Sequence, residues 1–195
     1  MRKIGILGGT FDPVHNAHLE LARLAIEQYH LDFVLFIPTG MPVRKLATTH
    51  ASAMDRLQML EIACAGVGEF RVSPIEVNRQ EVTYTIDTLR ELKSLFGRNS
   101  ELYLILGEDT ATDLATWKDS SEIAKLVKVL YARRPGTEAN ATLPEGYECK
   151  LIEMAPNAVS SSALRAALEN NEAVDEYLPA EVLTYIKKYG LYGKL

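Results

Sequence analysis

The residues best suited to chemistry near the start of the sequence are two glycines, Gly8 and Gly9, followed by two histidines, His15 and His18. Glycine lets backbone amides approach a ligand without a Cβ in the way. Histidines three positions apart share one face of a helix, so both imidazoles can donate hydrogen bonds to one ligand. Triphosphate oxygens suit this combination. On spacing alone, a glycine turn followed by two partly exposed histidines remains an open alternative.

Asp12 and Pro13 favour a helix start just before the histidines, because aspartate is a preferred cap and proline is tolerated at the first helical position. Free amides and the positive end of the helix dipole would favour an anion there. A zinc site is disfavoured, since the histidine pair lacks the HExxH form and no obvious third ligand follows. The sequence has no Walker pattern GxxxxGK[ST].

A second candidate site is the run Ser160, Ser161 and Ser162, with Arg165 one turn later. Serine is a preferred helix cap, so an ordinary N-terminus before an Ala/Leu-rich helix is the plainer interpretation. The functional interpretation is an anion site, in which hydroxyls and free amides hold β- and γ-phosphates and the arginine adds a forked donor.

Other candidates carry less information by themselves. The basic pairs Arg44-Lys45 and Arg133-Arg134 are either solvated surface charge or ligand contacts. Trp117, the only tryptophan, is either core or a flat face for a pyridine ring.

Short apolar runs alternate along the chain with segments of helical periodicity. The runs predicted as strands are residues 3–7, 33–37, 70–73, 102–106, 127–132 and 150–154. The segments predicted as helices are residues 19–29, 54–65, 85–96, 120–125, 160–168 and 179–189. Apolar strands separated by helices indicate parallel pairing with helices on both faces. We therefore expect an α/β fold, a Rossmann-like doubly wound parallel sheet, with residues 1–195 in a single domain that has a small C-terminal helical part at about 160–195.

The candidate residues follow the predicted strands. In open parallel sheets, ligands bind beyond the carboxyl ends of the strands. Five loops predicted at one edge carry glycines, basic residues, histidines, carboxylates and hydroxyls, among them Gly107 and Asp109. This coincidence, more than any single motif, predicts a phosphate-rich ligand. The longest predicted loops are residues 39–50 and 135–146.

Bulk properties narrow the class of protein. The 195 residues are 47% apolar and 24% charged, typical of a globular domain, and the net charge is −5. Non-specific binding to nucleic acid or to a membrane surface is therefore not expected. Two cysteines without metal spacing suit a reducing compartment, with Cys64 in a predicted core helix, and we see neither a signal peptide nor a membrane span, so a cytoplasmic location is expected.

Two segments resemble a known superfamily. Residues 8–19 read GGTFDPVHNAHL, close to the GGTFDPxHxGH signature of the HxGH nucleotidyltransferases, and residues 159–165 read VSSSALR, similar to their second motif, ISSTxIR. Within that superfamily the chain resembles bacterial nicotinate-nucleotide adenylyltransferase over nearly its full length. The supporting segments are YTIDTL at 84–89, Gly107 and Asp109 with Trp117, and RRPG at 133–136.

The resemblance implies transfer of AMP from ATP to nicotinate mononucleotide, giving deamido-NAD and pyrophosphate in NAD biosynthesis, by direct in-line attack. Mg²⁺ would be held mainly by the ATP phosphates. The residues it implies as catalytic are His15, His18 and Arg165. Those implied for ATP are Gly8, Gly9, Thr10, Phe11, His15, His18, Gly107, Asp109, Ser160, Ser161, Ser162 and Arg165. Those implied for the mononucleotide are Arg44, Lys45, Tyr84, Thr85, Trp117 and Arg134.

Three departures from the family pattern bear on the site. Ala17 replaces a glycine between the histidines, residues 42–45 read PVRK in place of PPHK, and Ser162 replaces a threonine. The alternatives that remain are a nicotinamide-nucleotide or related HxGH adenylyltransferase and a non-catalytic nucleotide-binding sensor. A redox Rossmann protein would need GxGxxG after the first strand, where this chain has GGTF. The sequence leaves a homo-oligomer open.

Overall fold

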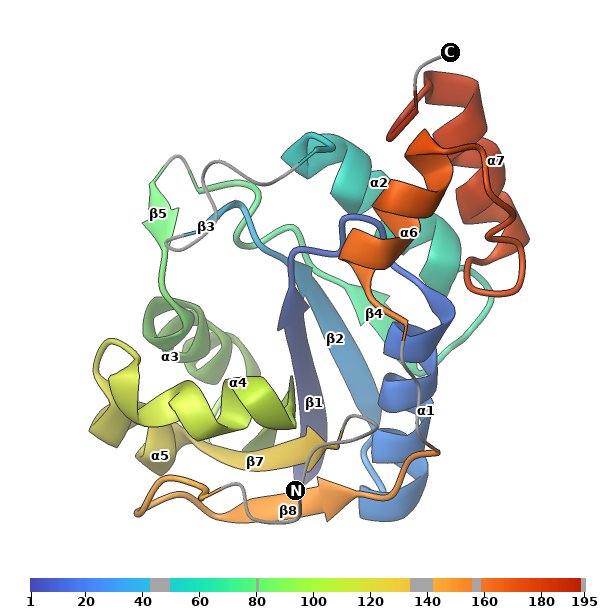
Figure 1. Ribbon diagram of the computed structural model, residues 1–195. Coiled ribbons are helices and arrows are strands. Elements are labelled where there is room, and N and C mark those ends of the chain that lie inside the picture. The colour runs from blue at the N-terminus through green and yellow to red at the C-terminus, as the bar shows by residue number, and fades with distance from the viewer. Residues whose placement is uncertain (43–49, 80, 134–141, 156–158, 194–195) are drawn as a thin grey trace.

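The main feature of the fold is a six-stranded sheet in which every neighbouring pair of strands is parallel (Figure 1). The computed structural model describes residues 1–42, 50–79, 81–133, 142–155 and 159–193. In spatial order the strands are β4 (Phe70–Val72), β2 (Phe33–Pro38), β1 (Arg2–Gly9), β6 (Ser100–Gly107), β7 (Val127–Ala132) and β8 (Cys149–Ile152). This order confirms the expected α/β fold with a doubly wound parallel sheet.

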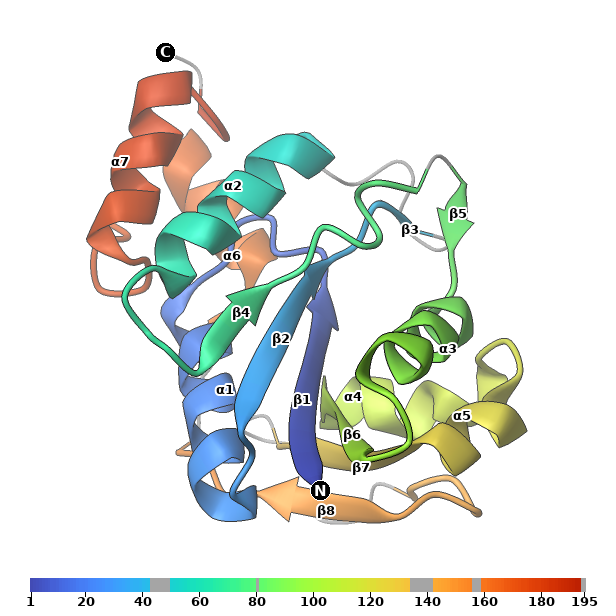
Figure 2. The same cartoon turned by 180° about the vertical axis from the view of Figure 1, so that it is seen from behind.

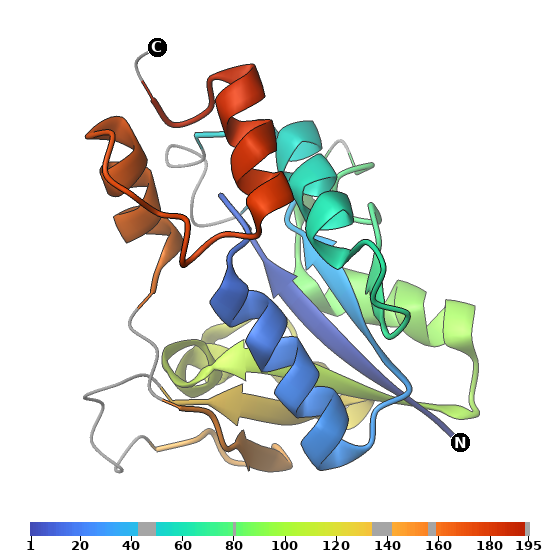
Figure 3. The same ribbon diagram turned by 90° about the vertical axis from the view of Figure 1, so that its right-hand side faces the viewer.

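Helices cover both faces of the sheet, as Figures 2 and 3 show from two further directions. The first face packs against α1 (Asn16–Tyr29) and α2 (Ala53–Cys64). Residues of α6 (Ser161–Glu169) and α7 (Ala180–Tyr189) join the same hydrophobic cluster, with α7 packed on α2. The second face packs against α3 (Thr85–Phe96), α4 (Glu108–Thr112), the 3₁₀ turn η1 (Asp113–Thr116) and α5 (Ser120–Leu126).

Alternation along the central strands divides the core into two clusters. In β2, Val34 and Phe36 join the first cluster, whereas Phe33, Leu35 and Ile37 join the second. Because both faces are covered, all six residues of this strand are buried and the sequence is continuously apolar. Burying each such side chain contributes about 1.5–3 kcal/mol to folding.

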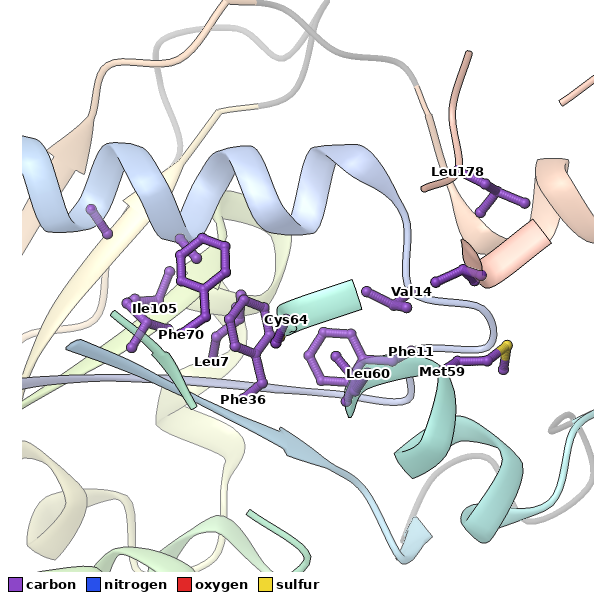
Figure 4. Close-up of a cluster of buried hydrophobic side chains, with 14 of the residues drawn as sticks. Leu7, Phe11, Val14, Phe36, Met59, Leu60, Cys64, Phe70, Ile105 and Leu178 are labelled. Atoms are coloured by element: carbon purple, nitrogen blue, oxygen red, sulfur yellow. The ribbon is translucent and has the colours of Figure 1, made fainter. Parts of the chain in front are cut away.

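The first cluster reaches the edge of the sheet where the strands end. Figure 4 shows Phe36 and Phe70 from the sheet beside Cys64 of α2, with Phe11 and Met59 further along. The rings of Phe36 and Phe70 meet edge to face, with centroids 5.2 Å apart. The loop after β1 is therefore anchored in the core at Phe11, which is 1% exposed.

The structure corrects the predicted helix start. Helix α1 begins at Asn16, and His15 stands in the cap position, so Asp12 is not the cap and Pro13 is not its first residue. The Asp12 carboxylate instead accepts hydrogen bonds from the amides of His50 and Ala51. A partner 38 positions away in the sequence has replaced the local one.

Short elements were not predicted from the sequence. Inside the expected loop at 39–50, Met41–Pro42 forms β3 and pairs in parallel with β5 (Val82–Thr83). Residues 43–49 lie outside the described ranges. In the described part of the chain, none of the helices is both long and apolar enough to cross a membrane.

The strand order reverses direction beside β1, which lies between β2 and β6. From β1 the chain proceeds to β2 and β4 on one side, then crosses to β6, β7 and β8 on the other. Such a switch point leaves a crevice beyond the carboxyl ends of the two strands, where ligands bind in open α/β sheets. Gly9 and Gly107 are the residues that end these strands.

Candidate active site

A cavity of about 1110 Å³ opens at this switch point, large enough for two nucleotides side by side. It is lined by every predicted site residue that the structure describes, namely Gly8, Gly9, Thr10, Phe11, His15, His18, Tyr84, Thr85, Gly107, Asp109, Trp117, Ser160, Ser161, Ser162 and Arg165. The remaining predicted residues, Arg44, Lys45 and Arg134, lie outside the described ranges. Segments far apart in the sequence thus share one cavity.

The loop after β1 forms the floor of the cavity. Phe11 has φ of 50°, in the left-handed region, and its buried ring packs edge to face against His18 with centroids 5.0 Å apart. A Cβ added at Gly9 would lie 3.2 Å from that ring, so glycine permits the close approach. The backbone at Thr10 is held in place because its carbonyl accepts a 2.7 Å hydrogen bond from Nη1 of the buried Arg56.

The two histidines lie against each other at the start of α1. Their rings stack with centroids 3.7 Å apart and an interplanar angle of 24°, and His15 is only 4% exposed. The backbone N–H of His15 donates to Nδ1 of His18 at 3.2 Å. Because this nitrogen accepts, the proton of a neutral His18 ring belongs on Nε2, which is thereby a hydrogen-bond donor.

The second motif is joined directly to the first. Ser161 Oγ donates to the carbonyl of Pro13 at 3.0 Å, and Arg165 Nη1 donates to the carbonyl of Asp12 at 2.7 Å, across 148 and 153 residues of sequence. The convergence of the two motifs in one cleft is therefore confirmed.

Helix α6 combines a conventional cap with donor groups that suit an anion. Ser160 Oγ accepts from the amide of Ala163 at 3.2 Å, so the plain capping interpretation holds for Ser160. Arg165 Nη2 donates to Ser162 Oγ at 3.3 Å, which fixes the guanidinium beside the first turn of the helix. A hydroxyl and a fixed guanidinium together form an anion-binding arrangement.

The opposite wall comes from the ends of β6 and β7. Gly107 caps α4, and Asp109 lies in the first turn of that helix. Between them Glu108 is turned inward, with its side chain 3% exposed, and its carboxylate forms a 3.0 Å ion pair with Nε of Arg133. A buried carboxylate requires such a partner. The pair links the two strand ends that carry this wall.

The far end of the cavity is aromatic. Tyr84 caps α3 and is followed by Thr85, and Trp117 directly follows η1. All three residues line the cavity. The Lys118 ammonium sits 4.1 Å from the centroid of the Tyr84 ring and 3.6 Å from Asp87 Oδ2. This end therefore offers flat faces together with a cation.

Some lining residues were not singled out from the sequence. They are Thr39, Thr83, Asp113 and Lys118, whereas Arg133 also lines the cavity and belongs to a basic pair considered from the sequence. Thr39 directly follows a predicted strand, which was a usable signal, but nothing in the sequence pointed to the other three, which reach the cavity only through tertiary packing. Over the described residues, no group of three or more His, Cys, Asp or Glu side chains is placed to hold a metal ion.

Known proteins share both the sequence and the fold. The chain matches the cytidylyltransferase-like family over residues 6–167. A probable nicotinate-nucleotide adenylyltransferase of Dehalococcoides mccartyi is 42% identical, with 98% of each chain covered. One from Chromobacterium violaceum is 36% identical, with 97% of this chain and 98% of the relative covered.

Among solved structures, a nicotinic acid mononucleotide adenylyltransferase of Plasmodium falciparum complexed with NaAD superposes with a TM-score of 0.84 at 21% identity, covering 98% of both chains. This likeness shows the shared Rossmann-like fold. The curated relatives, matched over nearly their whole length, show the family. On these grounds the chain belongs to the nicotinate-nucleotide adenylyltransferase family of nucleotidyltransferases, as its motifs indicated.

Proposed function

We propose that the protein transfers AMP from ATP to nicotinate mononucleotide, producing nicotinate adenine dinucleotide and pyrophosphate for NAD biosynthesis. One observation carries this proposal: two motifs about 150 residues apart in sequence are hydrogen-bonded to each other in a cavity that has room for both nucleotides. The reaction needs such an arrangement, because the two phosphates must meet in line.

The transfer is a single displacement. An oxygen of the mononucleotide phosphate attacks the α-phosphorus of ATP, a new P–O bond forms, and the bond to the β-phosphate oxygen breaks as pyrophosphate leaves. No protein nucleophile is required. Catalysis of this kind rests on positioning and on stabilising charge on the phosphoryl oxygens.

The floor of the cavity supplies the donors for the triphosphate. Nε2 of His18, set as a donor by the backbone bond to Nδ1, is assigned to the α-phosphate, with His15 stacked behind it. Ser161, Ser162 and Arg165 are assigned to the leaving pyrophosphate, together with the free amides that begin α6. The other ATP contacts assigned are Gly8, Gly9, Thr10, Phe11, Gly107, Asp109 and Ser160, with Asp109 accepting from the ribose hydroxyls.

The aromatic end of the cavity is assigned to the mononucleotide. Trp117, Tyr84 and Thr85 frame the pyridine ring, since indole and phenol faces stack on flat heteroaromatic rings. Basic residues from the loops, Arg44-Lys45 and Arg134, are assigned to its phosphate. Arginine at position 44 keeps the cationic character of a loop that departs from the family pattern.

Magnesium fits the chemistry of these donors. The described lining of the cavity offers imidazole, hydroxyl and guanidinium groups, which suit phosphate oxygens, and it also contains the carboxylates of Asp109 and Asp113. Mg²⁺ retains waters and binds substrate phosphates, so it would be held mainly by ATP. When bound, it neutralises charge on the phosphoryl oxygens.

The same proposal includes the domain organisation of the chain and its cellular compartment. Residues 1–195 act as one nucleotidyltransferase domain, in which the part from about residue 160 contributes α6 to the site. Cys64 and Cys149 are free thiols, which suits a reducing cytoplasm.

An acceptor assay tests the proposal. ATP and Mg²⁺ are supplied with nicotinate mononucleotide, nicotinamide mononucleotide or phosphopantetheine, pyrophosphate release is followed, and the product mass is measured. We expect the highest kcat/KM with nicotinate mononucleotide. A higher value with another acceptor would reassign the substrate, and absence of pyrophosphate with all three would overturn the proposed activity.

A further inference from the structure

Asp12 connects separate segments of the candidate active site through hydrogen bonds. Its side chain is 2% exposed, and its carboxylate accepts from the amides of His50 at 2.8 Å and Ala51 at 3.1 Å. Its carbonyl accepts from Arg165. The position of Asp12 therefore determines both the start of the segment leading into α2 and the place of the Arg165 guanidinium.

A third donor to this carboxylate comes from beyond α7. The hydroxyl of Tyr192 donates to Asp12 Oδ1 at 2.6 Å, across 180 residues of sequence, and Tyr192 is only 8% exposed. Burial, together with the hydrogen bond to the Asp12 carboxylate, raises the pKa of Tyr192 above its ordinary value, so the hydroxyl keeps its proton and remains a donor at neutral pH.

The backbone around Tyr192 is bent to make this contact. Gly190 ends α7 with φ of 62°, and Tyr192 itself has φ of 63°. For a bulky L-residue the left-handed region is strained and persists only where surrounding contacts fix it. Helix α7, which precedes this turn, is held against α2 because the Tyr185 hydroxyl donates to Asp55 Oδ1 at 3.0 Å.

We propose that Tyr192 is a positioning residue for adenylyl transfer, acting through Asp12 on Arg165 and on the segment at residues 50–51. This inference rests on the proposed function of the cavity. Without the Tyr192 hydroxyl, a buried carboxylate lacks one donor and Asp12 can shift. The groups that bind the substrates remain, but in-line alignment suffers, and small misplacements affect rate more than affinity.

The variant Tyr192→Phe tests the inference by separating kcat from binding. We expect kcat per folded site to fall about tenfold, corresponding to a modest loss of alignment, while the dissociation constants of ATP and nicotinate mononucleotide stay within about twofold. The matched control is Tyr189→Phe, since Tyr189 is an exposed tyrosine of α7. It should keep the wild-type kcat.

A second readout does not depend on activity. Amide hydrogen exchange at His50 and Ala51 should be about fivefold faster in Tyr192→Phe, because their hydrogen bonds to the Asp12 carboxylate are weakened. The exchange rates should be unchanged in Tyr189→Phe. This measurement distinguishes the two proposals: an inactive wild-type enzyme overturns the proposed function, whereas the exchange rates still report whether Tyr192 fixes the partners of Asp12.

The variant Asp12→Ala tests the contact from the other side, which matters if Tyr192→Phe does not fold. Loss of the acceptors of Tyr192, His50 and Ala51 should lower kcat at least as much, and the double variant should resemble Asp12→Ala alone, because the Tyr192 hydroxyl acts only through Asp12. Wild-type kcat in folded Tyr192→Phe, unchanged exchange at residues 50–51, or additive losses in the double variant would each overturn the inference.

Discussion

His18 illustrates how a neighbouring backbone group determines what a side chain can do. The bond from the His15 amide to Nδ1 leaves Nε2 as the donor, and the edge-to-face contact with Phe11 holds the ring against the floor of the cavity. A donor fixed before the reaction requires no reorganisation when charge develops on the α-phosphate.

The variant His18→Ala should therefore lower kcat by roughly 10²–10³-fold, the usual effect of removing one transition-state donor. The measurement is steady-state pyrophosphate release, with thermal unfolding as a check of the fold. His30→Asn is the control, because His30 ends the same helix in the left-handed region, which asparagine tolerates. Near-normal turnover of His18→Ala would rule out the assigned role.

For individual residues, the sequence predicted which ones line the cavity but not which hydrogen bonds hold them there. Glycines, histidines, serines and Arg165 could be selected because their types and spacing suit phosphate. The role of Asp12 was predicted wrongly, because local rules favour a helix cap and its real partners lie 38 and 180 positions away. Partners at such separations leave no trace in a local pattern.

The long elements were predictable because their burial is regular. Strands buried on both faces are continuously apolar, as β2 and residues 102–106 of β6 are. Helix α3 was placed at residues 85–96 with its correct bounds. The paired strands β3 and β5 were missed since two residues are too few to show a period. They matter nonetheless, because they lie beside the end of the cavity assigned to the mononucleotide.

Gly40 controls how closely the segments after β2 and β4 can pack. A Cβ at this position would lie 2.1 Å from the carbonyl oxygen of Glu76, which is backbone and cannot move aside cheaply. Gly40→Ala should therefore displace β3. We expect KM for nicotinate mononucleotide to rise roughly tenfold, which corresponds to a free energy in the lower part of the range that overpacking costs. KM for ATP should stay nearly unchanged.

The control for this variant is Gly68→Ala. Gly68 lies between α2 and β4, and a Cβ there would meet nothing within 4 Å. Equal increases in both KM values for Gly40→Ala would show that the disturbance is general, and the assignment of that end to the mononucleotide would lose its support.

For the whole molecule, two separate clusters on the faces of one sheet provide the stability. Cys64 belongs to the first cluster and is 6% exposed (Figure 4). Burial raises the pKa of its thiol from 9.0 to about 12. The neutral thiol therefore stabilises the folded state below about pH 9, and this contribution is lost as the pH rises toward 12.

Alkaline unfolding should reveal this linkage. Between about pH 8 and about pH 10.5, the difference in unfolding free energy between the wild type and Cys64→Ala should narrow by about 2 kcal/mol, because only the wild type has this thiol to ionise. Denaturant titrations at several pH values measure it. A difference that stays constant with pH would show that the thiol is not shielded from water.

The hydrogen bond between Asp12 and Tyr192 also sets the order of events during synthesis. The strands and helices near the start of the chain emerge from the ribosome and can fold early. The loop after β1 lacks its Tyr192 partner until residue 192 has emerged as well. On the proposed role of Tyr192, a growing polypeptide without this residue would transfer AMP about tenfold more slowly than the chain that includes it.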